Sequence, residues 1–477
     1  METITTFNWN AVIGEGVLFA FAVITLLADA LLGKPLSKRI FPLALIGLFV
    51  ALAAESWGVY SEGGAFGDIL SQSHSFGIFA VICAILTALM ALQYYAKGGG
   101  NINEFLSMLM ICTAGLMLFV RSRDLMLSFV ALETATICLY AMSAWSRKSA
   151  SSLEAGARYL ISGGVSGAII LMGIALIYGA GLPANSDLLN FSNVSFGLDN
   201  DLFMSGLMFV VCGLLFKISA FPFQFWSPDV YQGSPTPVSA FFAVASKGAG
   251  IAFLLTLCAS FDFSKDLAHI HDKLVSTFSV VAACTILVGN LGGITQIRTK
   301  RLMAFSGIAN AGYLLVLVAA ALKVGPSVGL EDVLYFYLLA YMFANYGVFF
   351  VVNRFGEIDD AEQSLADYRG LKLRSPIALG TLIVNLASLS GIPPTAGFFG
   401  KLLILIAAWA AGLYWLVGVM IIGSVMSIYY YFGWMRAALE PAEGEERQLI
   451  ETPSMSATMV ALSVATVVFS AVVYAII

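Results

Sequence analysis

Long apolar runs alternate with short polar stretches along almost the whole chain of 477 residues. A helix needs about 20 predominantly apolar residues to cross roughly 30 Å of hydrocarbon. Measured against that length, the sequence predicts fourteen membrane-spanning segments, which cover residues 11–32, 40–60, 76–96, 104–120, 124–145, 158–180, 202–226, 237–260, 274–294, 302–322, 331–352, 376–410, 411–436 and 454–477. We therefore expect an all-α polytopic membrane protein.

Two of these segments contain prolines that interrupt the helical pattern. Pro222 lies near the end of 202–226, and Pro393 and Pro394 lie within 376–410, which is too long for one straight helix. Proline lacks a backbone N–H and clashes with the preceding turn, so each site is expected to break its helix. Irregular backbone at membrane depth is tolerated only where it is buried in protein or lines water. Both breaks therefore indicate a cavity or a buried polar region, with an inert kink as the alternative.

The two breaks occupy corresponding positions in two halves of the chain, which is the pattern expected for internal repeats in transport proteins. We predict an N-terminal three-helix segment (1–100), two five-helix repeats (101–262 and 263–438) and a C-terminal helix (439–477). An odd number of helices in each repeat inverts the second copy relative to the first. Direct similarity between the halves is limited to the breaks.

Composition supports a membrane protein and excludes several other classes. Hydrophobic residues make up 59% of the chain and charged residues only 11%, against roughly 25% charged residues in soluble domains. A net charge of -5 without a long basic block leaves no electrostatic footprint for nucleic acid. The first apolar segment contains Glu15 and Asp29, which indicates a retained span and not a cleaved signal peptide.

Recognisable cofactor and metal patterns are not found in the sequence. The six cysteines lie in apolar stretches without a C-x-x-C pair, and we interpret them as core residues. His269 and His271 form an H-x-H in a loop, which we interpret as solvated. Gly163 and Gly167 predict close helix packing and not phosphate binding, because no strand precedes them. We expect no cofactor and no metal in this chain.

The distribution of the 24 basic residues predicts the orientation, because Lys and Arg accumulate in cytoplasmic loops. If the N-terminus faces away from the cytoplasm, 16 basic residues fall in inner loops and 5 in outer loops. Fourteen spans then place the C-terminus on the non-cytoplasmic side as well. Arg121 and Arg123 belong to the outer set. Lys300 and Arg301 are interpreted as cytoplasmic anchors, with an entry funnel as an alternative for Lys300.

The remaining three basic residues, Lys217, Lys247 and Lys401, fall inside predicted membrane segments. A charged residue near the bilayer centre costs at least about 2.5–3.5 kcal/mol, and such residues often mark an ion or proton path. Glu133 lies in the middle of 124–145 and is the expected partner of a buried lysine. The structural alternatives are a lysine that snorkels to the membrane surface and a glutamate that bonds a neighbouring helix.

The surroundings of the three lysines differ. Lys217 lies five residues before Pro222, and Lys401 follows the second break closely. Lys247 is flanked by Ser246, Gly248 and Gly250, whose small side chains leave room for water and for close helix contact. A lysine beside a helix break predicts a hydrated cavity.

Three long blocks around these residues resemble a known family. They are KISAFPFQFWSPDVYQGSPTPVSAFFAVASKGAG (217–250), NLGGITQIRTKRLMAFSGIANAGYLL (290–315) and SLSGIPPTAGFFGKLLIL (388–405). They resemble the antiporter-like membrane subunits of respiratory complex I, and most of all the N-type subunit of bacterial NADH:quinone oxidoreductase, which corresponds to mitochondrial subunit 2. The similarity extends over nearly the whole chain.

The resemblance implies a proton channel of fourteen helices with two inverted five-helix repeats, in which helices seven and twelve are broken. It implies that Glu133 and Lys217 form a glutamate–lysine pair, that Lys247 is a central lysine and that Lys401 is a terminal lysine, all four acting as a proton relay. Asn310 departs from the family, because relatives often carry histidine there. That difference puts in doubt any relay step that needs an imidazole at this position.

The resemblance also implies partners and a location. The chain would lie in the bacterial inner membrane with antiporter-like paralogues and small membrane subunits, and quinone reduction elsewhere in the complex would drive it. FMN, iron–sulfur clusters and quinone would be held by other subunits, with NADH as electron donor. The alternatives are a subunit of a multi-subunit cation/proton antiporter, a ferredoxin- or hydrogenase-linked relative, and a purely structural membrane spacer.

Overall fold

The computed structural model of the chain describes residues 12–32, 40–60, 74–96, 101–180, 201–259, 268–325, 329–355, 360–441 and 453–474. Within these ranges the backbone is helical apart from turns, short bends and isolated bridge residues such as the antiparallel pair Arg298 and Ser364. Eleven of the described helices are long and apolar enough to cross a membrane. The prediction of an all-α polytopic membrane protein is therefore confirmed.

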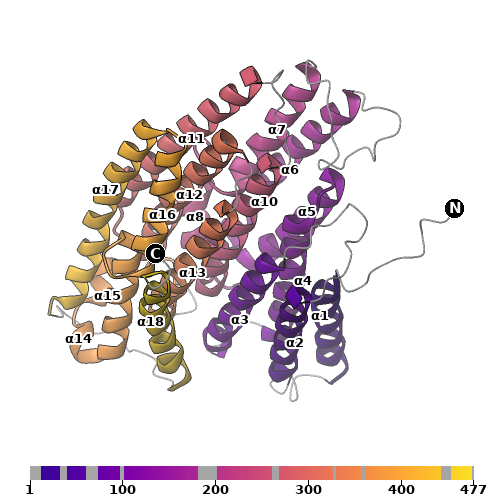
Figure 1. The fold of residues 1–477 in the computed structure, drawn as a ribbon. Coiled ribbons are helices and arrows are strands. Elements are labelled where there is room, and N and C mark those ends of the chain that lie inside the picture. The colour runs from indigo at the N-terminus through magenta and orange to yellow at the C-terminus, as the bar shows by residue number, and fades with distance from the viewer. Residues whose placement is uncertain are drawn as a thin grey trace.

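The first six helices occupy one side of the molecule (Figure 1). They are α1 (Ile13–Leu32), α2 (Phe41–Tyr60), α3 (Ser75–Ala96), α4 (Ile102–Arg121), α5 (Leu125–Ser143) and α6 (Ala150–Gly179). Helix α1 packs against α2 and α4, and α3 packs against α4. Polar side chains begin several of these helices: the Asp124 carboxylate, for example, accepts a hydrogen bond from the Leu127 amide at 2.7 Å, which satisfies one of the free N–H groups of α5.

The central part of the chain contains both long helices and short helical pieces. They are α7 (Asp201–Lys217), α8 (Trp226–Gly233), α9 (Thr236–Phe241), a π-helical turn (Phe242–Ser246), α10 (Lys247–Ala259), α11 (Ala268–Ile294), α12 (Thr299–Val324) and α13 (Leu330–Arg354). Helix α12 is the most buried of the eleven spans, with 94% of the residues in its apolar window buried inside the protein. It contacts α8, α10, α11 and α16, so it forms the centre of the bundle.

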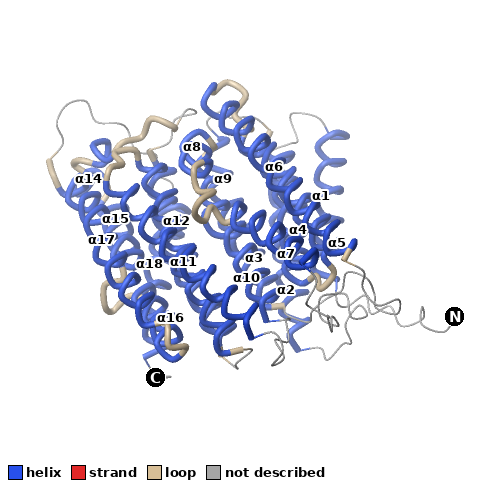
Figure 2. Tube along the Cα trace, turned by 90° about the horizontal axis from the view of Figure 1, so that it is seen from above, coloured by secondary structure: helices blue, strands red, loops and turns tan. Residues whose placement is uncertain are grey.

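The last part of the chain lies at the opposite side from α1 (Figures 1 and 2). A 3-10 turn (Leu365–Tyr368) precedes α14 (Leu371–Arg374), α15 (Pro376–Ser390), α16 (Ala396–Ala410), α17 (Tyr414–Leu439) and α18 (Pro453–Tyr474). Helices α15 and α16 both pack against α13, α17 and α18. The Thr466 hydroxyl of α18 donates to the Asn385 side-chain oxygen of α15 at 2.9 Å, a buried polar contact that fixes the last helix.

The predicted segments agree with the observed helices. Eleven of the fourteen coincide with the membrane-spanning helices, the combined α9–α10 element included. Segment 202–226 divides into α7 and the start of α8, and 376–410 divides into α15 and α16. Segment 454–477 contains α18, which is described as far as Tyr474. The four-part division of the chain and the inversion of its repeats remain predictions.

The outward faces of the bundle are apolar. Exposed side chains include Leu27 on α1, Ile161 on α6 and Val425 on α17, which are 56%, 70% and 62% exposed. Such faces are unfavourable in water and match lipid or a neighbouring apolar protein surface. The low charge content of the sequence thus corresponds to an apolar outer surface of the helix bundle.

Arg121 differs from its expected place in a loop, because it is the last residue of α4 and is buried. Its Nη1 atom lies 2.8 Å from Glu15 Oε1 and 3.7 Å from Glu55 Oε1. The other Glu55 oxygen lies 2.8 Å from Nδ1 of His74. A Cβ added at Gly14 would lie 1.9 Å from Glu55 Oε1, so the glycine lets this carboxylate lie directly against α1.

Candidate functional site

The four ionisable residues expected at membrane depth all lie in described helices. Lys217, Lys247 and Lys401 are buried, with 5%, 5% and 8% of their surface exposed, and Glu133 is 23% exposed. Long lysine side chains that snorkel would end at the protein surface. Because all three lysines are enclosed by the bundle, the snorkelling alternative does not describe them.

Glu133 and Lys217 come together as a pair between α5 and the end of α7. The Lys217 Nζ atom lies 3.5 Å from Glu133 Oε1 and 3.4 Å from the Tyr140 hydroxyl, which is also on α5. The second Glu133 oxygen accepts a hydrogen bond from Thr136 at 3.1 Å. A Cβ at Gly167 of α6 would lie 2.9 Å from Glu133 Oε1. The predicted close packing at Gly167 is therefore confirmed, and it makes room for the carboxylate.

The first helix break begins directly after Lys217, where α7 ends. Ser219 has a positive φ of 60°, and the Phe221–Pro222 peptide bond is cis. The Phe216 carbonyl accepts from the Trp226 indole at 3.0 Å, and the Phe221 amide donates to the Thr285 hydroxyl at 3.0 Å. Side chains thus satisfy backbone groups that the break leaves without helical partners.

Lys247 follows the π-helical turn and is the first residue of α10. Its Nζ atom lies 5.2 Å from the centre of the Tyr231 ring on α8, within cation–π range. No side chain or backbone group in the described part of the chain accepts a hydrogen bond from this ammonium. Short π-helical segments inside α-helices occur frequently at functional sites. The hydropathy pattern did not predict this turn.

The two roles expected of the small residues around Lys247, helix contact and room beside the ammonium, belong to different glycines. A Cβ at Gly248 would lie 3.1 Å from Phe79 of α3, so this glycine serves helix packing. Space for the ammonium comes from Gly307 on α12, where a Cβ would lie 2.9 Å from Lys247 Nζ and 3.3 Å from the Tyr341 hydroxyl. The expected room beside the lysine exists, but a distant glycine supplies it.

Lys401 reaches back from α16 to the end of α15. Its Nζ atom donates to the carbonyl oxygens of Leu389 at 2.8 Å and Ser390 at 3.3 Å. These carbonyls belong to the last turn of α15, where intrahelical donors are missing. Gly391 ends that helix with a φ of 82°, a conformation that glycine adopts readily, and the Pro393–Pro394 bond is cis.

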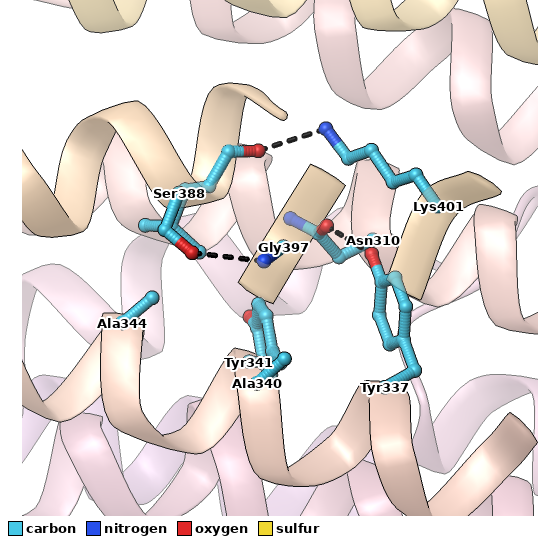
Figure 3. Close-up of a pocket in the computed structure, with 9 residues that line it drawn as sticks. Asn310, Tyr337, Ala340, Tyr341, Ala344, Ser388, Gly397 and Lys401 are labelled. Atoms are coloured by element: carbon cyan, nitrogen blue, oxygen red, sulfur yellow. Dashed lines mark hydrogen bonds between the residues drawn. The ribbon is translucent and has the colours of Figure 1, made fainter. Parts of the chain in front are cut away.

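A small cavity lies beside Lys401 (Figure 3). Its lining includes Asn310 of α12, Tyr337 and Tyr341 of α13, and Ser388 of α15. The space open to a water molecule is about 10 Å³, which is near the smallest volume that holds one water. The Tyr337 hydroxyl donates to the Asn310 side-chain oxygen at 2.6 Å. The cavity at the second break thus combines polar groups from three helices.

A chain of polar side chains continues from this cavity through the core. Asn310 donates to the Ser306 carbonyl at 2.8 Å, and the Ser306 hydroxyl is hydrogen-bonded to Tyr431 of α17. Among the described residues, no hydrogen bond or ion pair joins the three lysines directly to one another. Tyr341 connects the surroundings of Lys247 and Lys401. Its hydroxyl and the Lys247 ammonium both lie beside Gly307, and Tyr341 also lines the cavity next to Lys401.

Other predicted features are placed as follows. Cys83, Cys112 and Cys258 are buried, and all six cysteines are free thiols. Among the described residues, no group of three or more His, Cys, Asp or Glu side chains is arranged to hold a metal ion. The side chains of His269 and His271 lie outside the described part.

The fold and these residues define a polytopic membrane protein with ionisable side chains at two helix breaks. The family described as "NADH:quinone oxidoreductase/Mrp antiporter, TM" matches residues 122–427. This chain belongs to that family. The resemblance seen in the three sequence blocks is therefore confirmed.

Relatives of similar length support the assignment. The chain is 40% identical to "NADH-quinone oxidoreductase subunit N 1" of Opitutus terrae, over 96% of this chain and 93% of that protein. It is 36% identical to "NAD(P)H-quinone oxidoreductase subunit 2" of Trichormus variabilis, over 89% of this chain and 81% of that protein.

Solved structures share the fold. A chain of respiratory complex I from Thermus thermophilus is 31% identical, with a TM-score of 0.79 over 96% of this chain and 97% of that chain. A chain of the archaeal membrane-bound sulfane sulfur reductase has a TM-score of 0.80 at 23% identity, over 97% and 95% of the two chains. A chain of the Mrp complex from Dietzia has a TM-score of 0.77 at 19% identity, over 97% and 95%. The last two show a shared fold only.

Proposed function

We propose that this chain is a proton-translocating membrane subunit of an NADH:quinone oxidoreductase. The observation that carries the proposal is the contact of Glu133 with Lys217 at a helix break inside the membrane, 3.5 Å between Oε1 and Nζ. The 40% identity to a subunit N and the 31% identity to a complex I chain favour this enzyme. The multi-subunit antiporter alternative shares the fold at only 19% identity.

In this proposal Glu133, Lys217, Lys247 and Lys401 each hold or pass a proton at mid-depth. The Glu133 carboxylate attracts the ammonium form of Lys217. When the pair separates, the ammonium loses its counter-charge, which favours release of its proton. Two like charges about 10 Å apart at an effective dielectric constant of about 20 repel by roughly 1.7 kcal/mol. A proton that arrives at one lysine can therefore displace a proton from the next.

The path from Lys247 to Lys401 would use hydroxyl groups and water. Asn310 has no group that exchanges a proton at neutral pH, so it serves as a hydrogen-bond partner. The Tyr337 and Tyr341 hydroxyls each donate and accept, and the cavity beside them is near the size of one water. Proton movement past Asn310 then needs no imidazole.

The driving energy would come from partner subunits. Moving one charge against 100 mV requires about 2.3 kcal/mol. Because the relatives named above are subunits of larger NADH:quinone oxidoreductase complexes, we propose that other subunits hold FMN, iron–sulfur clusters and quinone. We further propose that the chain lies in the cell membrane with both termini on the non-cytoplasmic side.

The test uses the intact complex in proteoliposomes, with NADH-driven quinone reduction and proton uptake measured together. Lys217→Ala is expected to lower the protons pumped for each quinone reduced by at least several-fold, while the subunit stays in the complex. Lys323→Ala is a matched control, because Lys323 is an exposed lysine paired with Asp272 at 3.1 Å. Normal pumping by Lys217→Ala would contradict the relay, and normal pumping by Glu133→Ala, Lys217→Ala would favour a structural spacer.

A further inference from the structure

The short helix α8 lies between Lys217 and Lys247 in the sequence and contacts the surroundings of both. Its first residue, Trp226, donates to the Phe216 carbonyl beside Lys217 at 3.0 Å. Its Tyr231 ring lies under the Lys247 ammonium, 5.2 Å from the ring centre. A helix of eight residues does not hold its own conformation or position. Other contacts must therefore fix α8.

A buried ion pair holds the end of α8 and the start of α9. Lys300, at the start of α12, donates to Asp360 Oδ1 at 2.6 Å and to the Ser234 carbonyl at 2.8 Å. The second Asp360 oxygen accepts from the Thr236 amide at 3.2 Å and from the Thr236 hydroxyl. Lys300 and Asp360 are 1% and 3% exposed. Lys300 is therefore not an anchor at the membrane surface.

A second set of contacts holds the middle of α8. Asp229 accepts hydrogen bonds at 2.5 Å from Arg158 of α6 and from Arg301 of α12. Arg301 also donates to Gln232 at 3.2 Å. Arg158 and Arg301 are 53% and 34% exposed and Asp229 is 32% exposed, so each ion pair contributes little stability. Arg158, Asp229 and Gln232 border an open pocket of about 240 Å³. Its lining also includes Gly233, which precedes Ser234, and Ala361, which follows Asp360.

Stability alone does not explain the buried pair. Replacing a buried ion pair with apolar residues of similar volume is often neutral or stabilising, because the charges must lose their water. What apolar residues cannot reproduce is the contact with the backbone. Lys300 binds the carbonyl that ends α8, and Asp360 binds the amide that begins α9. The pair therefore determines where the turn between α8 and α9 lies.

We propose that Lys300 and Asp360 are positioning residues of the proton relay. They hold the α8–α9 turn, and through Trp226 and Tyr231 they set the positions of Lys217 and Lys247 together. The inference rests on the proposed function, because it assigns these two residues a part in proton movement. It adds a connection between two lysines that do not touch.

The experiment compares variants that keep the pair with variants that keep only the packing. Asp360→Glu retains both charges and lengthens the carboxylate arm by one methylene, which shifts the turn. Lys300→Met with Asp360→Leu removes both charges and keeps the volume. Both are expected to lower the protons pumped for each quinone reduced by several-fold, with the complex assembled and quinone reduction retained. Normal pumping by either assembled variant overturns the proposal.

A hydroxyl comparison keeps the test decisive if the double variant does not assemble. Thr236→Val removes the hydroxyl that donates to Asp360 and nearly conserves shape, while Thr236→Ser keeps the hydroxyl. The proposal expects reduced pumping with valine and recovery with serine, and equal pumping by the two would contradict it. Lys217→Ala is measured beside them. If Lys217→Ala pumps normally, the proposed function fails. If Lys217→Ala loses pumping while Asp360→Glu pumps normally, only the positioning role is overturned.

Discussion

Both helix breaks contain a cis X–Pro peptide bond, but they stabilise their lysines in different ways. At the first break Lys217 precedes the interruption and faces the Glu133 carboxylate, while Trp226 and Thr285 satisfy the free backbone groups. At the second break Lys401 follows the interruption and itself satisfies the last carbonyls of α15. Within the described part of the chain, Lys401 has no ion-pair partner. A full opposite charge thus holds one lysine, and carbonyl dipoles hold the other.

Glu133→Gln is expected to reduce proton pumping more than the other variants below, because it changes the feature that distinguishes the first break from the second. It removes the negative charge that distinguishes the first break and leaves Lys217 with only neutral acceptors. Proton pumping by the intact complex should fall by several-fold, while quinone reduction continues. Glu154→Gln is the control, since Glu154 is an exposed glutamate of α6 that pairs with Arg158. Equal pumping by the two variants would show that the charge of Glu133 is not needed.

Lys401→Met should act mainly at the second break. It removes the donor to Leu389 and Ser390, and an unsatisfied buried carbonyl costs about 1–3 kcal/mol. We expect a lower melting temperature of the subunit as well as reduced pumping, in contrast to Glu133→Gln. Unchanged thermal stability in a detergent-solubilised complex would mean that water replaces the ammonium there.

Trp226→Phe is expected to have a smaller effect on the first break. The aromatic ring that stacks on Tyr159 is kept, but the indole donor to the Phe216 carbonyl is lost. The loss of this hydrogen bond should destabilise the fold by about 1–3 kcal/mol. Chemical denaturation of the purified subunit, compared with Trp409→Phe at an exposed position of α16, measures the difference.

Tyr337→Phe should give the smallest change. It leaves the Asn310 amide oxygen without its donor at 2.6 Å and removes one hydroxyl from the cavity (Figure 3). Pumping is expected to fall about twofold to tenfold, equivalent to roughly 0.4–1.4 kcal/mol. Tyr346→Phe provides the control on the same helix, because that hydroxyl points to α3 and bonds Thr87 and Cys83. Similar pumping by both variants would remove Tyr337 from the path.

The sequence predicted the helices and the charged site because both leave local signals. Apolar length identified the spans, and a lysine among apolar residues is conspicuous without knowledge of its neighbours. Glu133 and Lys217 are 84 residues apart and could be paired because both violate the same hydropathy pattern. Proline marked both interruptions for the same local reason.

The partners that complete the site could not be predicted from the sequence alone. Gly307 and Tyr231 are ordinary residues for buried helices, and only tertiary packing brings them to Lys247. The Lys300–Asp360 pair joins residues that both occur in polar stretches, where charge is expected and gives no signal of burial. Arg121 was wrongly predicted to lie in a loop for the same reason, since a charged residue at the end of an apolar run is typical of a loop.

The π-helical turn at Phe242–Ser246 has a consequence for insertions and deletions. A π turn contains one more residue than the hydrogen-bonded turn of an α-helix, and one residue corresponds to about 100° of rotation. Deletion of a single residue here would close the π turn into regular α-helix and leave the direction of α10 nearly unchanged. A regular α-helix formed by the same residues would instead turn α10 by about that angle. Lys247 would then face away from Tyr231 and Gly307, although every side chain of the site would still be present. The angular phase of one helix is therefore set by the hydrogen-bond pattern of the turn before it as well as by the identity of its residues.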